Sequence, residues 1–485
     1  MTKFTDFEKC LSTQNEIEKR DFCIGNNEIC LFYIDCLVDK QILSSSVLIA
    51  IKSSGDKFKK QNDKNALDII FSQILGASIV EKVFDEGEAL DEILSGNIII
   101  TDKNSEFALK VSASGYSKRS IVEPPTSATI KGPREGFIED IQVNKSLIRK
   151  RLKTKSLFVE EIVVGRHTKT TIDIMYLDGV ADKKVVKRVK EKINKYHIDG
   201  VIDSRYIIEF LQSGQDQFFK KVGTSEKPDI VVAKMLEGRV AILIDGSPIV
   251  LTVPFMLFED VQSVEDYYDV PLKATFSRII RLVGIFISIL LPGLYVALES
   301  YHYRVLPINF FINLLGSLEN ISLPPMLEIL FVLFLFDILN EASLRMPKQL
   351  GMALSIIGAL ILGDTAVQSG IISSPSIVVV AISGIALYII PDEVSEATIF
   401  RSIFTLIGGI AGLYGLICGV LVLSVYIVSV SSFGTSYVAP FAPSISEDKK
   451  DGIIKQPITR MKTRPLSIQK KNKTRLRERG KHANY

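Results

Sequence analysis

The stretch TIDIMYLDGVADK, Thr171–Lys183, contains an apolar run, a turn and a helix start in direct succession. The run TIDIMYLD is typical of a β-strand, and the Asp-Gly pair that ends it suits a turn. Asp182, near the end of the stretch, is a residue type that caps helix N-termini through its carboxylate. The order of strand, turn and helix predicts an α/β fold for this part of the chain.

An earlier part of the chain repeats this pattern. YIDCLVDK at Tyr33–Lys40 aligns with YLDGVADK at Tyr176–Lys183, and an apolar strand-like run leads into each copy. Between the copies, residues 116–135 contain Gly, Pro and Ser in the proportions of a linker. We therefore expect two related soluble α/β subdomains, residues 1–115 and 136–277, on either side of that linker.

Three Asp-Gly pairs are candidates for turns or for carboxylates in a cleft. The segment EGRVAILIDGSPIVLTVP, Glu237–Pro254, places one of them between two apolar runs, which is the signature of a β-hairpin. The pairs at residues 178–179 and 199–200 also follow apolar residues. We favour turns over a catalytic cleft for all three, because Asp and Gly are residues that turns require.

Hydropathy changes sharply near residue 278, where mixed apolar and charged sequence gives way to long apolar runs. The five runs lie at residues 279–299, 327–347, 350–372, 376–390 and 403–430. A bilayer crossing needs about 20 apolar residues, which the first run supplies. We expect an all-α multi-pass membrane domain of about 4–5 helices over residues 278–432, followed by a basic cytoplasmic tail over residues 433–485.

Charge at the two ends of the chain predicts its orientation. Residues 449–481 carry thirteen Lys and Arg against two acids, a local charge of +11 in a chain whose net charge is +3. The polar N-terminal residues lack the apolar core of a secretory signal peptide. A cytoplasmic N-terminal half and a basic cytoplasmic tail require an even number of crossings. We favour four crossings, with the second run interfacial or re-entrant, over five.

The second run, LEILFVLFLFDILNEASLRMP, carries ionisable residues that a membrane helix rarely accepts. A charge at bilayer depth costs roughly 2.5–3.5 kcal/mol on insertion scales. At 100° per residue, Asp337, Glu341, Arg345 and Lys348 share one stripe, while Glu328 points to nearly the opposite side. Glu341 and Arg345 have the i,i+4 spacing and order of a favourable ion pair.

Two interpretations of this stripe stay open. In the first, the helix lines a water-filled pathway, and Asp337 or Glu341 attracts cations. In the second, the helix lies at the membrane interface and its charges pair structurally. Glu328, Asp337, Glu341 and Arg345 are accordingly the candidate pore or gate residues.

Small residues in the fifth run predict close helix packing. Gly408 and Gly412 form one GxxxG pair, and Gly415 and Gly419 form a second. Such pairs let helix backbones approach closely in lipid, within a subunit or between subunits. Helix softening or breaks are expected at the Pro292–Gly293 pair and at residues 363–364.

Enzyme and metal chemistry receive no support from the sequence. It contains no P-loop, GxSxG, HExxH or nucleotide-binding GxGxxG motif. The five cysteines are odd in number and lack CxxC spacing, so we expect plain reduced thiols. The basic segment Gly132–Leu152 suits either binding to an acidic partner or to anionic lipid headgroups, or a solvated helix with a cationic C-terminal end. We expect no catalytic residue, no cofactor, no metal site and no nucleic-acid partner.

Several segments together resemble the GerA family of spore germination proteins, and in particular the A subunit of a germinant receptor. These segments are GPREGFIEDIQVNKSLIRKRL, VGRHTKTTIDIMYLDGVADKKVV, EKPDIVVAKMLEGRVAILIDGSPIVLTVP, QSVEDYYDVP, SILLPGLYVALESYHYRVLP and SSFGTSYVAPFAP. The resemblance extends from the first repeat to the basic tail. It departs at Cys36, where the family pattern YIDGL has glycine, so the first turn is altered if that glycine has a positive φ.

The resemblance implies a function, a location and partners. It implies a multi-pass protein of the spore inner membrane that acts with a permease-like B subunit and a lipoprotein C subunit. It also implies a homo-oligomer, with the pentamer as the candidate state, that forms a nutrient-gated cation channel. The alternative is a non-conducting membrane scaffold that couples the B and C subunits. No catalytic residue is carried over from the family.

Overall fold

The computed structural model describes most of the chain. The described residues are 7, 16–24, 27–49, 51, 66–71, 80–102, 105–115, 132–214, 218–318, 321–345, 358, 363, 365–390, 394–468 and 472–476. The chain divides into two compact units. The first unit comprises Met1–Phe255, Ser432–Thr435 and Lys462–Tyr485, and the second comprises Met256–Ser431 and Ser436–Met461. Residues 256–277 thus group with the helices, and residues 433–485 are shared between both units, which differs from the expected boundaries.

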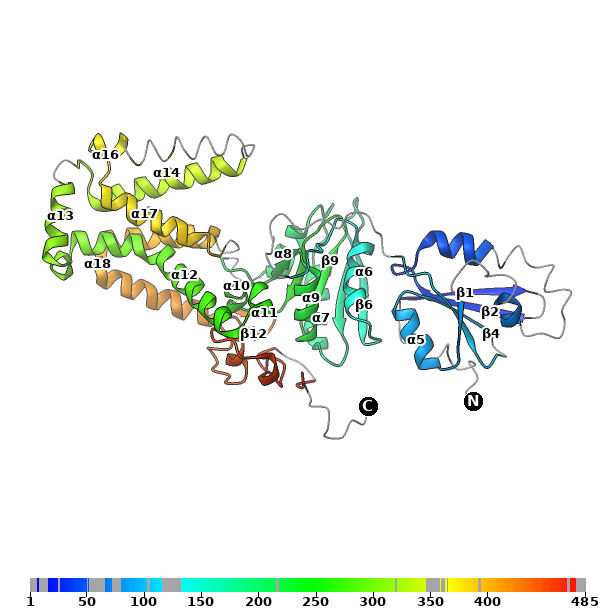
Figure 1. The fold of residues 1–485 in the computed structure, drawn as a ribbon. Coiled ribbons are helices and arrows are strands. Elements are labelled where there is room, and N and C mark those ends of the chain that lie inside the picture. The colour runs from blue at the N-terminus through cyan, green and yellow to red at the C-terminus, as the bar shows by residue number, and fades with distance from the viewer. Residues whose placement is uncertain are drawn as a thin grey trace. The chain divides into compact units, whose positions relative to one another are not determined.

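The elements of the first unit are mostly short strands and helices (Figure 1). The strands are β1 (Ile17–Ile24), β2 (Asn27–Ile34), β3 (Val80–Val83), β4 (Ile98–Asp102), β5 (Ala108–Val111), β6 (Leu157–Val164), β7 (Thr170–Leu177), β8 (Gly223–Ser225), β9 (Val240–Ile244) and β10 (Val250–Val253). The helices are η2 (Ile42–Leu48), α4 (Ala66–Ile69), α5 (Glu86–Leu94), α6 (Ile141–Arg151), α7 (Lys183–Asn194), α8 (Ser204–Gln212) and α9 (Pro228–Leu236).

The predicted repeat is confirmed by two five-stranded sheets with equivalent topology. The first sheet has the order β1-β2-β4-β5-β3, and the second has the order β6-β7-β9-β10-β8. Every described pairing within both sheets is antiparallel. Each β-strand of one copy therefore has a counterpart at the same place in the other copy.

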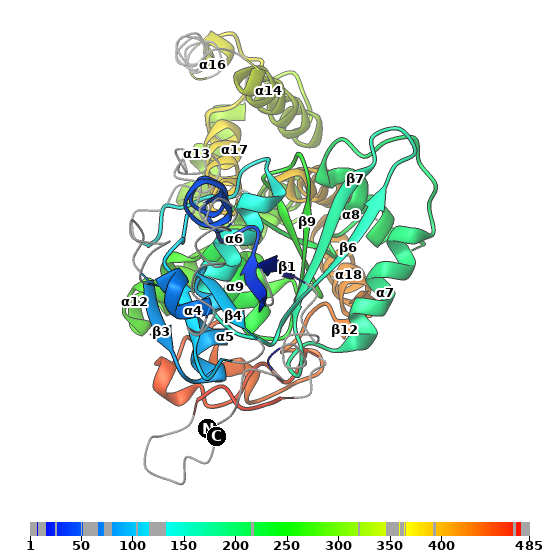
Figure 2. The ribbon, with the colours of Figure 1, turned by 90° about the vertical axis from the view of Figure 1, so that its right-hand side faces the viewer.

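Helices cover both faces of the second sheet (Figure 2). Ile172 and Ile174 of β7 pack with α7 and α8, whereas Met175 and Leu177 pack with α6 and α9. This alternation follows from the two-residue period of a strand. The sheet is apolar on both faces because helices cover most of each face. The first sheet is enclosed in the same way, by η2 and α4 on one face and by α5 on the other.

The turns of the repeat behave as predicted, with one difference. Asp39 accepts a hydrogen bond from the Gln41 amide at 2.8 Å, and Asp182 accepts one from the Lys184 amide at 2.9 Å. The expected caps are thus present in both copies. Gly179 has a φ of 78°, but Cys36 at the matching position has no positive φ, so the first turn takes another conformation. Burial raises the pKa of the Cys36 thiol to about 11.

Two further predictions in the first unit concern the β-hairpin and the basic end of α6. The Glu237–Pro254 hairpin is confirmed, since β9 and β10 pair antiparallel on either side of a turn in which Gly246 has a φ of 84°. The basic end of α6 is not simply a solvated face. Arg149 is 1% exposed and pairs with Glu16, while Lys150 and Arg151 both contact Glu135. Most of the predicted linker, residues 116–131, lies outside the described residues.

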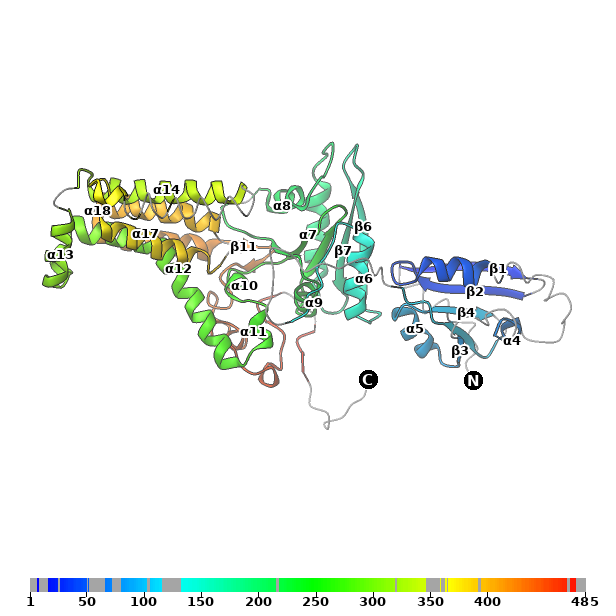
Figure 3. The same ribbon diagram turned by 45° about the horizontal axis from the view of Figure 1, so that its top comes forward.

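The second unit consists mainly of long helices (Figure 3). Its helices are α10 (Phe258–Val261), α11 (Glu265–Tyr268), α12 (Pro271–Ser300), η4 (Tyr303–Val305), α13 (Ile308–Leu318), α14 (Pro325–Arg345), α16 (Ala366–Gln368), α17 (Ser374–Leu387), α18 (Val394–Ser429), η7 (Asp448–Lys450) and η8 (Ile458–Arg460). Two short strands, β11 (Ser431–Ser432) and β12 (Thr435–Ser436), complete the described elements. Helices α12, α14, α17 and α18 lie side by side, and α13 lies across one end of this bundle.

Length and hydropathy qualify two helices, α12 and α18, as candidate membrane spans. The expected break at Pro292 does not occur, because α12 continues through it to Ser300. Helix α17 is apolar but shorter. The third apolar run is described only at residues 358, 363 and 365–372, so Asp364 lies outside the described residues.

The fifth apolar run reverses direction rather than forming one straight helix. Gly412 has a φ of 62° and a ψ of −153°, which interrupts α18. A Cβ on Gly419 would lie 3.0 Å from Cε1 of Phe404, although fifteen residues of straight helix would separate them by about 22 Å. Residues 394–411 and 413–429 are therefore two antiparallel arms, which we call α18a and α18b.

Contacts give the direction of the other helices. Helices α14 and α17 are parallel, since Glu328 contacts Ser373 near both N-termini and Phe336 contacts Gly384 further along. Helix α17 is antiparallel to α12, as the Ser383 hydroxyl donates to the Ser288 carbonyl at 2.8 Å and Ile389 contacts Gly284.

Arm α18a is parallel to α12. Gly408 packs on Gly293, and the Tyr301 hydroxyl donates to the Gly409 carbonyl at 2.9 Å. Arm α18b runs antiparallel to α18a and therefore ends near the level at which α12 begins. The N-terminus of α12 and the C-terminus of α18b thus lie at the same end of the bundle.

Candidate functional site in the apolar helices

Asp337, in the middle of α14, is paired across the bundle rather than free. Its Oδ1 atom lies 2.7 Å from Nη2 of Arg401, which belongs to α18a. The Arg401 side chain is fully buried, whereas the Asp337 side chain is partly exposed. Aliphatic surroundings strengthen such a pair, because little water competes for either charge. One of the four candidate pore residues is therefore neutralised within its own subunit.

Glu341 and Arg345 form the ion pair that their spacing predicts. Oε1 of Glu341 lies 2.5 Å from Nη2 of Arg345, and both side chains are exposed. Both residues lie at the C-terminal end of α14, so this end is more polar than the apolar middle of the helix. Lys348, the fourth member of the predicted stripe, lies outside the described residues.

Glu328 lies at the opposite end of α14 and is completely buried. Its Oε1 atom accepts a hydrogen bond of 2.7 Å from the amide of Ser373, which is the N-cap of α17. A carboxylate at a helix N-terminus is favoured by the unsatisfied amides and by the helix dipole. Glu328 thus joins α14 to α17.

A second carboxylate belongs to the same end of the bundle. Glu299 and Tyr295, one turn apart near the C-terminus of α12, both interact electrostatically with Glu328. Tyr295 also faces Ser376 in the first turn of α17. Neither Glu299 nor Tyr295 was singled out from the sequence. Their separation from Glu328 along the chain hides the cluster, which α12, α14 and α17 assemble.

A third charged cluster lies where α12 begins. Arg278 is fully buried, with its Nε atom 3.0 Å from Asp266 Oδ2 and its Nη1 atom 3.1 Å from Asp451 Oδ1. Arg281 also pairs with Asp266, at 2.8 Å, and Lys455 donates to the Asp266 carbonyl. Burial lowers the pKa of Lys455. This cluster ties the segment after α18 to the first turns of α12.

Comparison with known families identifies the chain. The family model described as Bacillus/Clostridium GerA spore germination protein matches residues 5–467. The chain belongs to the GerA family. The resemblance inferred from the sequence motifs is thereby confirmed.

Characterised relatives of this GerA-family protein cover most of its length. Spore germination protein KA of Bacillus subtilis (strain 168) is 34% identical over 96% of this chain and 86% of the relative. Spore germination protein GerLA of Bacillus cereus is 29% identical over 96% and 94%, respectively. A crystal structure of the N-terminal domain of the A subunit of the Bacillus megaterium spore germinant receptor GerK3 covers 51% of this chain and 92% of that domain, with 27% identity and a TM-score of 0.40.

The glycines of the GerA-family bundle pack within the subunit. A Cβ on Gly408 would lie 2.3 Å from the Gly293 carbonyl oxygen, which only a glycine at this place avoids. Gly412 supplies the positive φ of the reversal, and Gly415 and Gly419 face α18a across it. Contact between subunits through these glycines stays a prediction.

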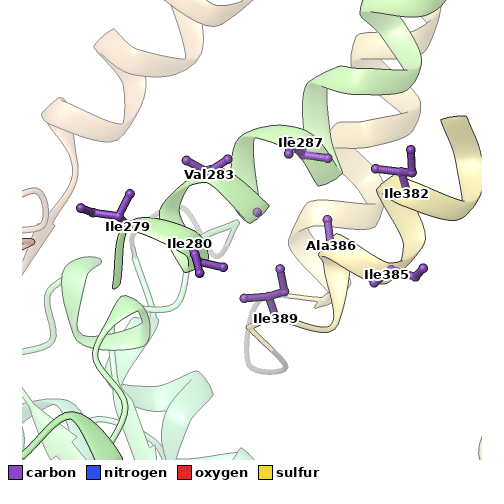
Figure 4. A pocket seen from close by; sticks show the side chains of 9 residues that line it. Ile279, Ile280, Val283, Ile287, Ile382, Ile385, Ala386 and Ile389 are labelled. Carbon is purple, nitrogen blue, oxygen red and sulfur yellow. The ribbon is translucent and has the colours of Figure 1, made fainter. Parts of the chain in front are cut away.

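An apolar groove lies between α12 and α17 of this GerA-family protein (Figure 4). Its lining residues are Ile279, Ile280, Val283, Gly284, Ile287, Ile382, Ile385, Ala386 and Ile389. The exposed aliphatic side chains along α12 and α18 extend the apolar surface. Water would solvate such a surface poorly, so it suits lipid tails or another apolar helix.

Sequence reasoning found the charged residues of α14 and the Glu341–Arg345 pair, but it missed the partners of Asp337 and Glu328 on other helices. Arg401 stands at the start of the fifth run, 64 residues from Asp337, and no local spacing connects them. The signal in the sequence for this partner was the position of Arg401, a basic residue beside an apolar run. Among the residues that the structure describes, no group of three or more His, Cys, Asp or Glu side chains is arranged to hold a metal ion.

Proposed function

We propose that this GerA-family chain is the A subunit of a nutrient germinant receptor and acts as an oligomeric, ligand-gated cation channel in the spore inner membrane. The family match and the relatives named as spore germination proteins support a role in germination. The channel function is the more specific part of the proposal. The observation that carries it is the placement of ionisable side chains on α14 within a largely apolar bundle.

The direction of the helices supports a membrane topology with both ends of the unit on one side. If the bundle spans the bilayer, α12, α14, α17, α18a and α18b each cross it. Helix α12 begins and arm α18b ends at the same end of the bundle, which would place the N-terminal half and the basic tail on the same side of the membrane. This arrangement agrees with the positive-inside rule for the basic tail. The four crossings expected from the sequence stay a prediction.

A contact between the C-terminal tail and α12 also supports a topology in which both ends of the unit lie on one side of the membrane. Asp451, which follows α18b, bonds to Arg278 in the first turns of α12. The N-terminal half and the tail are therefore proposed to be cytoplasmic. Residues 394–411 and 413–429 would each extend about 26 Å, close to the hydrocarbon thickness of a bilayer.

The four candidate residues take different roles in this proposal. Glu341 and Arg345 are exposed at the end of α14, where Glu341 would attract cations to the mouth of an oligomeric pore. Asp337 would hold the gate helix α14 against α18a through Arg401. Glu328 would anchor the other end of α14 to α17. Neighbouring subunits, five in the proposed pentamer, would enclose the pathway.

The proposed partners are a permease-like B subunit that binds the germinant and a lipoprotein C subunit. Germinant binding would shift the two α/β subdomains and bias the helices between closed and open states. Such coupling requires that the germinant-bound complex favours the open state energetically.

A non-conducting scaffold is the second candidate function. The pairing of Asp337 with Arg401 favours it, because this pair neutralises two charges that could otherwise line a pathway. In a scaffold, the bundle would only hold the B and C subunits together. Both candidates give the chain a membrane location and a role in germination.

Conductance separates the two functions. We would reconstitute the purified chain, alone and with its B and C subunits, in planar bilayers with potassium chloride. A channel gives cation current that germinant increases, and Glu341→Gln lowers that current without changing the amount of reconstituted protein. Absence of current at every potential, in complexes that still bind germinant, would leave the scaffold as the function.

A further inference from the structure

The C-terminal end of α12 and the N-terminal ends of α14 and α17 bring oxygen atoms together inside the bundle. The Glu328 side chain is 0% exposed, and its Oε2 atom has no hydrogen-bond partner among the described residues. Both carboxylate oxygens of Glu299 and the hydroxyl of Tyr295 are likewise buried and make no close hydrogen bond among the described residues, although the Tyr295 hydroxyl lies near Glu299 and Ser376. Three carboxylate oxygens are thus buried without a basic side chain or backbone amide that donates to them.

Packing brings these groups near one another, since Tyr295 belongs to the apolar cluster that contains Ile329, the residue after Glu328. Glu328 interacts electrostatically with both Glu299 and Tyr295, and Tyr295 lies one turn before Glu299 on α12. Within the described part of the chain, no basic side chain is among the groups that perturb Glu299. By contrast, Asp337 and Asp266 are each matched by arginine. The Glu299–Glu328 pair therefore differs from the other buried carboxylates of the bundle.

Two buried carboxyl groups without a basic partner are stabilised either by protonation or by positive charge from elsewhere. Taking an ionised carboxylate out of water is unfavourable unless it is paired or coordinates a metal. Oxygen ligands of this kind suit hard cations such as the alkali and alkaline-earth ions. The amide of Ser373 already orients one oxygen of Glu328, which leaves its other oxygen available for a ligand.

We propose that Glu299 and Glu328, with the hydroxyl of Tyr295, form a binding site for one hard metal cation in each subunit. The cation would draw together α12, α14 and α17 at the end of the bundle opposite Arg345. Protonation of one carboxylate would compete with the cation for this site. The inference does not depend on conduction, because a scaffold with the same helices would bind the ion equally well.

To test this site, we would measure how the stability of the purified full-length chain in detergent depends on the cation present. Thermal unfolding would be followed by scanning calorimetry while potassium, sodium, magnesium or calcium chloride replaces choline chloride at constant ionic strength. Binding to the folded state raises the melting temperature with a saturable dependence on ion concentration. We expect such a response for at least one of the four ions, which identifies the occupant. Four flat responses between pH 6 and pH 9 would overturn the proposal.

Single substitutions show which side chains bind the ion. Glu299→Gln and Glu328→Gln should each weaken the ion dependence at least tenfold, and the amide oxygen of the second variant still accepts from Ser373. Tyr295→Phe keeps the ring and should weaken binding several-fold, which provides a readout if the glutamine variants fail to fold. Glu396→Gln removes a partly exposed carboxylate from the first turn of α18a and serves as the control. A wild-type response in Glu299→Gln, Glu328→Gln and Tyr295→Phe would place the ion elsewhere and overturn the assignment.

Discussion

The guanidinium of Arg401 lies 2.7 Å from the carboxylate of Asp337, and this contact fixes α18a against the middle of α14. The two residues are 64 positions apart in the chain. The Arg401 side chain is fully buried, and Asp337, which is partly exposed, is the carboxylate that neutralises it. The stability of the helical unit should therefore depend on both partners together.

Removing one partner should destabilise the bundle strongly. Arg401→Gln leaves Asp337 without its cation, and Asp337→Asn leaves a fully buried guanidinium without its anion. Breaking a buried pair in this way costs about 3–5 kcal/mol. The double variant Asp337→Asn/Arg401→Gln should lose less than the sum of the single variants, which a double-mutant cycle measures by thermal unfolding in detergent.

The exposed pair of the same helix supplies a control for that cycle. Glu341→Gln should change the free energy of unfolding by about 0–1 kcal/mol, because water already solvates Glu341 and Arg345. Equal effects of Arg401→Gln and Glu341→Gln would contradict the structural role of the buried pair.

Arg278 should hold the segment after α18b against α12. Its guanidinium binds Asp266 and Asp451 as well as the Gly452 carbonyl, and lysine cannot reproduce this planar set of donors. We expect Arg278→Lys to destabilise this contact by about 3 kcal/mol and to speed hydrogen exchange and proteolysis in residues 445–455. Lys273→Gln, which removes an exposed partner of Asp269, is the matched control. Unchanged protection in Arg278→Lys would exclude a clamping role.

Gly408 should tolerate no side chain. Its Cβ would lie 2.3 Å from the Gly293 carbonyl oxygen, so Gly408→Ala forces α12 and α18a apart. We expect a loss of about 1–3 kcal/mol in unfolding experiments. In Gly316→Ala, the new Cβ has no atom within 4 Å, and the better helix propensity of alanine should leave stability equal or higher. Similar losses in both variants would point to a helix effect rather than to packing.

Low pH should weaken the ion pairs that Glu135 makes with Lys150 and Arg151 at the end of α6. The Lys150 ammonium and the Arg151 guanidinium lower the pKa of Glu135 below its ordinary value. A lowered folded-state pKa means that the pair stabilises the protein above the unfolded pKa of about 4.3 and loses this effect as the pH falls through the folded pKa. Hydrogen exchange of α6 amides in wild type and Glu135→Gln should differ at pH 7, by roughly 0.5–1 kcal/mol, and converge below pH 4. Parallel pH profiles without convergence would contradict this assignment.

Local sequence determined the parts of the protein that depend on neighbouring residues. The repeated motif predicted the two α/β copies, and Asp39 and Asp182 cap their helices because a cap needs only the next few amides. The Asp-Gly turn of the β9–β10 hairpin and the Glu341–Arg345 pair follow from fixed spacings in the same way. Apolar composition likewise predicted a C-terminal helical region.

Tertiary structure alone decided which distant charges meet. Arg401 reaches Asp337, and Glu299 reaches Glu328, only because the helices pack in particular directions. The reversal at Gly412 depends on the same packing, since a GxxxG spacing permits both a straight helix and a close turn between two arms. A hydrogen bond or ion pair between remote residues leaves no periodic signal along the chain, so its partners become visible only when the backbone brings them within a few ångströms.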